Sequence, residues 1–183
     1  MNFTESYRSQ LFDAISSVDL AAVERAIEWF RDARDNGQHI FVCGNGGSAS
    51  TASHFTCDII KGASYQKDKR FRMLALTDSL PTLTAYANDV EYAAVFEEQL
   101  KNFAKPGDIV MAISGSGNSP NVVRALACAN ELGCKTIALT GRDGGKLGPL
   151  AQLNIHVKSQ HMGRIEDAHM IVCHMICYRF MEF

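Results

Sequence analysis

Short apolar runs that alternate with helical patterns constrain the fold of this 183-residue chain more than any other feature. Each run is about as long as a buried strand, and the stretches between the runs are long enough for helices. Because parallel strands need crossover connections, this order is typical of a parallel sheet with helices on both faces. The runs predict five strands, near residues 39–43, 72–76, 108–113, 135–139 and 154–157.

The remaining stretches predict the helices that cover this sheet. Two of them lie within residues 4–36, where Asp19 can cap the second helix and Gly37 can end it. The second helix carries an apolar stripe formed by Leu20, Val23, Ile27 and Phe30. Further helical patterns occupy 48–60, 80–86, 92–103, 119–131, 145–151 and about 163–181.

Length and composition limit what the chain can be. It is the size of one domain, which we expect to consist of a helical segment at 1–36 and an α/β core at 37–183. A formal net charge of -2 argues against nucleic acid as the main partner, and no apolar run is long enough for a membrane span. We interpret a local concentration of cations as a solvated loop: Lys67, Lys69, Arg70 and Arg72.

The cysteines indicate the redox compartment. Six are present, none forms a CxxC pair, and most lie in apolar strand or helix patterns, where a thiol behaves as a small buried hydrophobe. The polar N-terminus does not look like a secretory leader. We therefore expect reduced thiols and a cytoplasmic protein.

Two loops rich in Gly, Ser and Asn follow the first and third apolar runs. They are Gly44–Ser50 and Ser114–Ser119, and Pro120 opens the helical pattern after the second. Glycines let the backbone approach a ligand, while hydroxyl groups and the N–H groups of a helix start donate to an anion. We therefore expect a phosphorylated small molecule at the carboxyl ends of the strands. Since a Walker-type lysine and the dinucleotide glycine spacing are both missing, no nucleotide cofactor is expected.

Carboxylate and imidazole groups near these loops suit proton transfer. His54 and Asp58 are four residues apart in the helical pattern after the first loop, so they share one face. Such a pair is more often a weak surface contact on spacing alone, but its position next to the loop favours a site. The last helix adds Glu166, Asp167, His169 and His174. Moving a proton between adjacent carbons and handling it on oxygen needs two such groups.

Several separated motifs together resemble the sugar isomerase (SIS) domain family, and phosphoheptose isomerases most of all. These motifs are Gly44–Ala49, Ala87-Asn88-Asp89, Ser114–Ser119, Leu139-Thr140-Gly141 with Asp143-Gly144-Gly145, and Arg164-Ile165-Glu166 before His169 and His174. The resemblance covers nearly the whole chain. It implies a flavodoxin-like three-layer fold with a five-stranded parallel sheet, a homotetramer, and active sites shared between subunits.

The resemblance also implies which residues hold the substrate. Ser114, Ser116 and Ser119 stand where the family binds the phosphate, and Gly115 replaces one hydroxyl of the family's loop. The implied set of substrate-binding residues is Asn45, Gly46, Gly47, Ser48, Asp89, Ser114, Gly115, Ser116, Ser119 and Glu166.

Catalytic roles follow from the same resemblance. Asp58 falls where the family has its catalytic glutamate, His174 matches the family's histidine, and Glu166 falls where the family has glutamine. Asp58 is the base, Glu166 has taken over, or both hold a metal; the sequence leaves all three open. The family's zinc form uses the same four positions, so the implied zinc set is His54, Asp58, Glu166 and His174.

We therefore expect an isomerase that interconverts sedoheptulose 7-phosphate and D-glycero-D-manno-heptose 7-phosphate. One alternative is a non-catalytic protein of the same fold that binds a sugar phosphate or assists assembly. The other is an isomerase for a different sugar phosphate. The presence of His54, an acid at 58 and His174 favours an enzyme over a binding protein.

Overall fold

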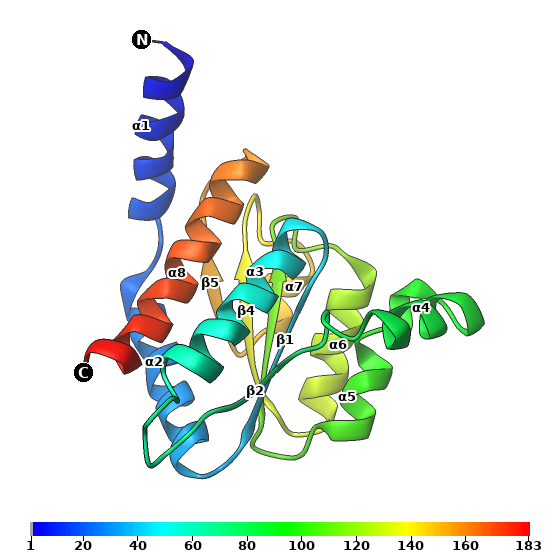
Figure 1. Cartoon of the computed structure of the whole chain (residues 1–183). Helices are drawn as coiled ribbons and strands as arrows, with labels where there is room; N and C mark the ends of the chain where they lie inside the picture. Colours follow the sequence, from blue (N-terminus) through cyan, green and yellow to red (C-terminus); the bar gives the residue numbers. More distant parts are fainter. Residues whose placement is uncertain (1) are drawn as a thin grey trace.

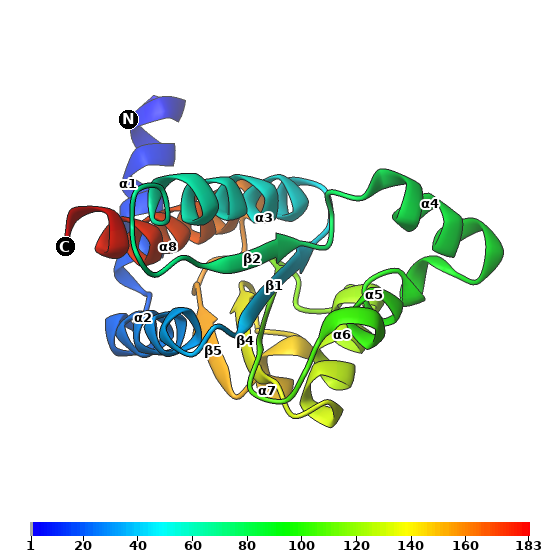
Figure 2. The ribbon, with the colours of Figure 1, turned by 60° about the horizontal axis from the view of Figure 1, so that its bottom comes forward.

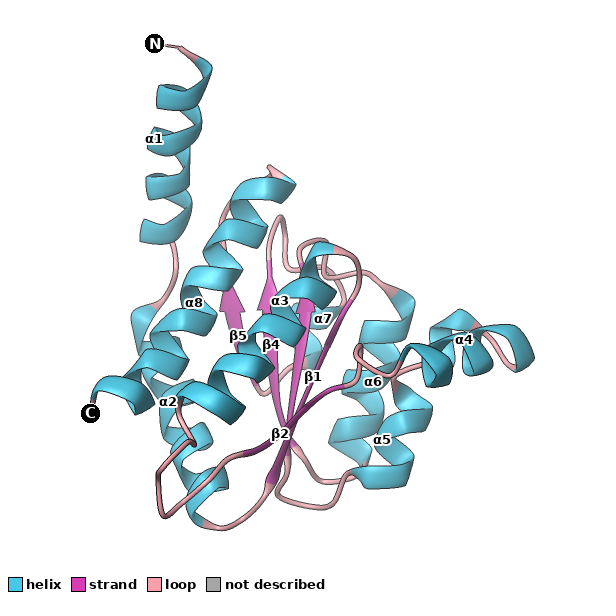
Figure 3. Cartoon of the chain, viewed as in Figure 1, coloured by secondary structure: helices cyan, strands magenta, loops and turns pink. Residues whose placement is uncertain are grey.

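Five parallel strands form one sheet in a computed structural model that describes residues 2–183. Met1, with which the expected N-terminal segment begins, lies outside the described residues. Figure 3 shows the strands side by side, and their order in the sheet is β2-β1-β3-β4-β5, which confirms the predicted sheet. The strands are β1 (His39–Gly44), β2 (Arg72–Ala75), β3 (Ile109–Ser114), β4 (Lys135–Thr140) and β5 (Leu153–His156).

Helices cover both faces of the sheet, and Figure 2 shows α3 and α8 side by side on one of them. This face is covered by α2 (Leu20–Asp35), α3 (Gly47–Cys57) and α8 (Met162–Glu182). The other face is covered by α5 (Glu97–Phe103), α6 (Pro120–Glu131) and α7 (Leu147–Leu150). Each face has its own apolar core, with Phe30 and Phe55 in the first and Phe96 and Leu100 in the second. The expected three layers are thus present.

Two helices extend beyond these layers (Figure 1). They are α1 (Phe3–Ser16) and α4 (Leu80–Asp89), which is followed by the short 3₁₀ turn η2 (Tyr92–Ala94). No residue of α4 is buried, and α1 buries Ala14 alone among its own residues. The Tyr7 hydroxyl on α1 donates a 2.6 Å hydrogen bond to Asp167 on α8, which ties α1 to the body.

Local signals explain how the second helix begins and ends. Asp19 accepts a 2.9 Å hydrogen bond from the backbone N–H of Ala21, and Gly37 has a positive φ of 67°, as a residue after a helix often does. Val23, Ile27 and Phe30 are buried as predicted. The placement of Leu20 in this stripe is wrong, because Leu20 is 60% exposed. It is the first residue of α2, and the buried residues of this helix begin at Ala22.

The strand order decides where a ligand can enter. The chain leaves β1 to form α3 on one face, and it leaves the neighbouring β3 to form α6 on the other. Gly44 at the end of β1 is paired with Ile113, next to the end of β3. Since the two following loops diverge from adjacent strands, they open a crevice between them. Among residues 2–183, no helix combines the length and the apolar character that a membrane crossing requires.

Candidate active site

A cleft of about 260 Å³ lies between the loops that follow β1 and β3. All the substrate-binding residues that the family resemblance implies line it, except Asp89. The cleft residues are Asn45, Gly46, Gly47, Ser48, Ile113, Ser114, Gly115, Ser116, Ser119, Met162 and Glu166. The motifs Gly44–Ala49 and Ser114–Ser119 thus lie together at one edge of the sheet with Glu166, whereas the motif Ala87-Asn88-Asp89 does not line this cleft.

Three hydroxyl groups meet in the second loop. The Oγ atom of Ser114 lies 3.3 Å from the Oγ atoms of both Ser116 and Ser119. Ser119 is the N-cap residue of α6, and Pro120 is in its first turn, as expected. All three serines line the cleft beside the N-terminus of α6, an arrangement suited to a phosphate group.

Close packing explains two glycines of this loop. A Cβ atom on Gly115 would lie 2.6 Å from Sδ of Met162, so Met162 occupies the space that a side chain would need. Gly117 has a φ of +64°, and a Cβ atom there would collide with the backbone of Gly144. The loop is therefore held in shape by α8 on one side and by the loop after β4 on the other.

Asn45 is fixed in the cleft by a network that the sequence did not reveal. Its amide exchanges two hydrogen bonds with the amide of Asn121, at 2.8 and 2.9 Å. The Tyr92 hydroxyl donates a further bond of 2.8 Å to Oδ1 of Asn45. Asn121 and Tyr92 come from distant segments and carry no motif, so only the fold connects them to the site.

Glu166 belongs to the phosphate cleft. Its carboxylate lies against Gly47, so that a Cβ atom at residue 47 would be 2.5 Å from Oε1 of Glu166. The missing side chain of Gly47 thus makes room for this carboxylate. A second acidic group, Asp58, lies just beyond the end of α3.

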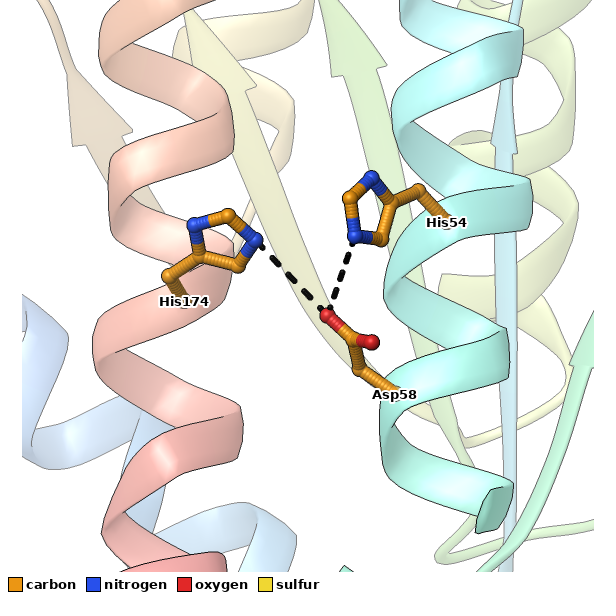
Figure 4. Close-up of side chains that lie close together, drawn as sticks. All are labelled: His54, Asp58 and His174. Carbon is orange, nitrogen blue, oxygen red and sulfur yellow. Dashed lines mark ion pairs between the residues drawn. The ribbon is translucent and has the colours of Figure 1, made fainter. Parts of the chain in front are cut away.

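Asp58 is flanked by two imidazole rings, as Figure 4 shows. Its Oδ2 atom lies 3.3 Å from Nε2 of His54 and 3.7 Å from Nε2 of His174. The two rings meet edge to face with 5.3 Å between their centroids. The side chain of Asp58 is 24% exposed, and those of His54 and His174 are 50% and 41% exposed. A carboxylate with two imidazoles is therefore within reach of a ligand between α3 and α8.

Two further features lie at Asp58: a π-helical turn in the backbone and the neighbouring thiol of Cys177. Asp58 begins η1 (Asp58–Gly62), a π-helical turn that continues α3; such turns are frequent at functional sites. The Sγ atom of Cys177 lies 3.9 Å from Oδ2 of Asp58. Burial, together with the charge of Asp58, raises the pKa of Cys177 to about 12, so the thiol stays protonated. Cys177 lies three residues after His174 on the same helix, so the two share a face. This spacing could have indicated from the sequence that the thiol lies beside the site.

Three of the four implied zinc ligands come together. His54, Asp58 and His174 each offer a ligand atom within 4.8 Å of the others, and nitrogen and carboxylate oxygen are donors that zinc accepts. Three protein ligands with one open position are typical of a catalytic zinc site. Glu166 is not part of this group, since its carboxylate lies at Gly47. The chemistry of the donor set therefore fits a zinc ion on three residues.

Two acidic residues lie away from the site of their own chain. Asp89 is exposed at the end of α4, where it accepts a 2.7 Å hydrogen bond from Nδ2 of Asn88. Asp167, seven residues before His174, faces α1 through its bond to Tyr7. Neither carboxylate lines the cleft.

The fold and the cleft define a sugar isomerase (SIS) domain, and residues 3–141 match the family model described as SIS domain. The probable phosphoheptose isomerase of Thermoplasma volcanium is 44% identical, over 88% of this chain and 82% of that protein. The phosphoheptose isomerase of Aliarcobacter butzleri is 43% identical, over 85% of this chain and 82% of that protein. The chain belongs to the phosphoheptose isomerases of the SIS family.

A solved structure agrees with this assignment. The phosphoheptose isomerase of Neisseria gonorrhoeae superposes with a TM-score of 0.90 at 30% identity, over 98% of this chain and 97% of that one. The resemblance read from the sequence motifs is thus confirmed.

Proposed function

We propose that this chain is an aldose–ketose isomerase that interconverts sedoheptulose 7-phosphate and D-glycero-D-manno-heptose 7-phosphate. The observation that carries this proposal is a cleft suited to phosphate between the loops after β1 and β3, together with a carboxylate between two imidazoles where α3 meets α8. The names of the similar proteins, all phosphoheptose isomerases, support the same substrate.

Asp58 is the base in this proposal. Its carboxylate removes the proton from the carbon next to the carbonyl group and returns it to the neighbouring carbon, with an enediol between the two steps. His174 opens the sugar ring and carries the proton to and from oxygen, since an imidazole nitrogen can both accept and donate a proton. His54 orients the Asp58 carboxylate from the opposite side. Glu166, in the cleft, orients sugar hydroxyl groups.

In an alternative form of the proposal, His54, Asp58 and His174 would hold a zinc ion, because the donor set fits this metal. Zinc would then supply a Lewis acid for the carbonyl oxygen, and Asp58 and His174 would act as its ligands rather than as proton carriers.

The assembly that we propose is a homo-oligomer, most simply a tetramer, whose sites are shared between subunits. Leu80, Val90 and Tyr92 are 67%, 61% and 57% exposed on and beside α4, so this region offers apolar surface for a second copy. Asp89, which lies outside its own cleft, would then reach the sugar of a neighbour. Light scattering coupled to size exclusion measures the number of subunits, and a monomer at working concentration would contradict the proposal.

Two further features complete the proposal. The chain acts as a single SIS domain with its helical segment at 1–36 and its core at 37–183. It works in a reducing compartment such as the cytoplasm, which the six free thiols support.

Proton NMR of the protein with sedoheptulose 7-phosphate tests the activity directly. We expect an aldoheptose anomeric signal to appear, and loss of this signal with a chelator and its return with zinc would identify the metal as required. Turnover of a pentose or hexose phosphate alone would support the alternative substrate. Tight binding of sedoheptulose 7-phosphate without turnover, with and without zinc, would support a binding protein instead.

A further inference from the structure

A second cavity, of about 330 Å³, lies at the C-terminal end of α8. The cleft between the loops after β1 and β3 lies at the other end of this helix. The walls of the second cavity come from α2, the segment between η1 and β2, and the C-terminal end of α8, which Figure 1 shows beside one another. Five cationic side chains line it: Arg31, Arg34, Lys67, Lys69 and Arg179. The cationic stretch noted in the sequence is thus joined by arginines from two other elements.

The cations of this cavity exceed the carboxylates beside them. Asp35 lies 2.9 Å from Arg34 and 3.4 Å from Lys69, and Asp68 also lines the cavity. Within residues 2–183, no carboxylate oxygen lies within 4.0 Å of Arg31, Lys67 or Arg179. A chain of net charge -2 therefore gathers uncompensated positive charge at one hollow. Such a concentration favours an anionic ligand.

Aromatic rings hold two of the arginines in place. The guanidinium carbon of Arg34 lies 5.6 and 5.4 Å from the ring centroids of Phe71 and Phe180. The guanidinium of Arg179 lies 5.1 Å from the ring centroid of Phe183. A guanidinium stacked through its face keeps N–H donors at its edge, where they match phosphate oxygens. The side chains are thus ordered for hydrogen bonding before a ligand arrives.

We propose that this cavity binds a ligand with two adjacent phosphate groups, such as a nucleoside diphosphate. Cations from three separate segments can surround a diphosphate, whereas a single phosphate would leave part of them uncompensated. The exposed ring of Phe183 offers an apolar surface for the organic part of the ligand. The cavity is of the size that small ligands occupy.

Isothermal titration with pyrophosphate and with ADP, at one fixed ionic strength, tests this site. We expect both to bind, and the double variant Arg31→Gln/Lys67→Gln to weaken binding about tenfold for each cation removed. Arg25→Gln is the matched control, because Arg25 is exposed on the same helix outside the cavity. Thermal unfolding of every variant confirms that it is folded.

The loop Ser114–Ser119, in the cleft between the loops after β1 and β3, also suits phosphate. The variant Ser116→Ala therefore distinguishes binding in that cleft from binding in the cationic cavity. Binding that survives Ser116→Ala and is lost in the double variant supports the proposal. Binding that is lost in Ser116→Ala and kept in the double variant would place the diphosphate in the cleft and overturn it. Absence of binding, or equal weakening by Arg25→Gln, would identify the cations as solvated surface groups. If ADP binds more tightly than pyrophosphate and Phe183→Ala removes this difference, the nucleoside contacts the ring of Phe183.

Discussion

The carboxylate of Glu166 lies against Gly47, at a distance that would leave only 2.5 Å between Oε1 and a Cβ atom on residue 47. This contact holds one acid of the site in the phosphate cleft. The other acid, Asp58, lies between His54 and His174. Of the three possibilities that the sequence leaves open, we propose Asp58 rather than Glu166 as the base, because Asp58 is the acid that contacts the two imidazoles.

Replacing Asp58 with Asn is expected to lower kcat by about 10²–10⁴, the usual contribution of a general base, while the sugar phosphate still binds. Turnover by NMR and binding by calorimetry measure the two effects separately. Glu131→Gln, on the exposed end of α6, is the matched control and should leave both unchanged. A variant that keeps more than about a tenth of kcat would exclude Asp58 as the base.

Glu166→Gln is expected to keep kcat within about tenfold and to leave KM unchanged or lower it. The substitution removes a negative charge from a cleft that receives a phosphate group, so it relieves repulsion in that cleft. Steady-state kinetics with sedoheptulose 7-phosphate measure both constants. A loss of kcat as large as that of Asp58→Asn would show instead that Glu166 moves the proton.

Gly115→Ser is expected to destabilise the protein by less than about 1 kcal/mol, because its Cβ atom would meet Sδ of Met162 at 2.6 Å and this flexible side chain can turn away. The double variant Gly115→Ser/Met162→Ala should recover part of this loss, since it removes the crowded atom. Urea unfolding of wild type, both single variants and the double variant gives the coupling. If the two substitutions change the free energy of unfolding additively, the collision with Met162 is not the reason for glycine at residue 115.

The stability of the protein is expected to fall as the pH drops from about 6.5 to about 4. His169 is buried, with Nε2 3.1 Å from the carbonyl oxygen of Thr140, and burial lowers its pKa from 6.5 to about 4. In this range the unfolded chain binds a proton that the folded protein refuses, so the free energy of unfolding decreases by about 3 kcal/mol.

Urea unfolding at a series of pH values measures this slope, and His169→Gln should flatten it. Burial and the charge of Lys158 also lower the pKa of His156, which adds to the slope with the same sign. His156→Gln is therefore the comparison variant, and it should flatten the curve less. An unchanged slope in His169→Gln would mean that other groups control acid unfolding.

Local chemistry made much of this protein predictable from its sequence. Strand runs, helix periodicity and caps such as Asp19 depend on neighbouring residues, so the five strands and their order along the chain could be predicted. The motifs after β1 and β3 also predicted a cleft between their loops, because parallel strands bring such loops to one edge. The sequence pattern wrongly placed Leu20 in the buried stripe of the second helix, because helical periodicity does not show at which residue the apolar face begins to contact the core.

Only the tertiary structure decided which side chains meet across helices. The pairing of Asp58 with His174 depends on how α3 packs against α8 and on the π turn at Asp58, neither of which residue spacing specifies. Glu166, eight residues before His174, points to Gly47 instead because it lies about 12 Å along the helix. The cation cavity has the same origin, because its side chains come from segments that become neighbours only when the helices pack. Spacing within a segment sets a face, and packing between segments sets what that face contacts.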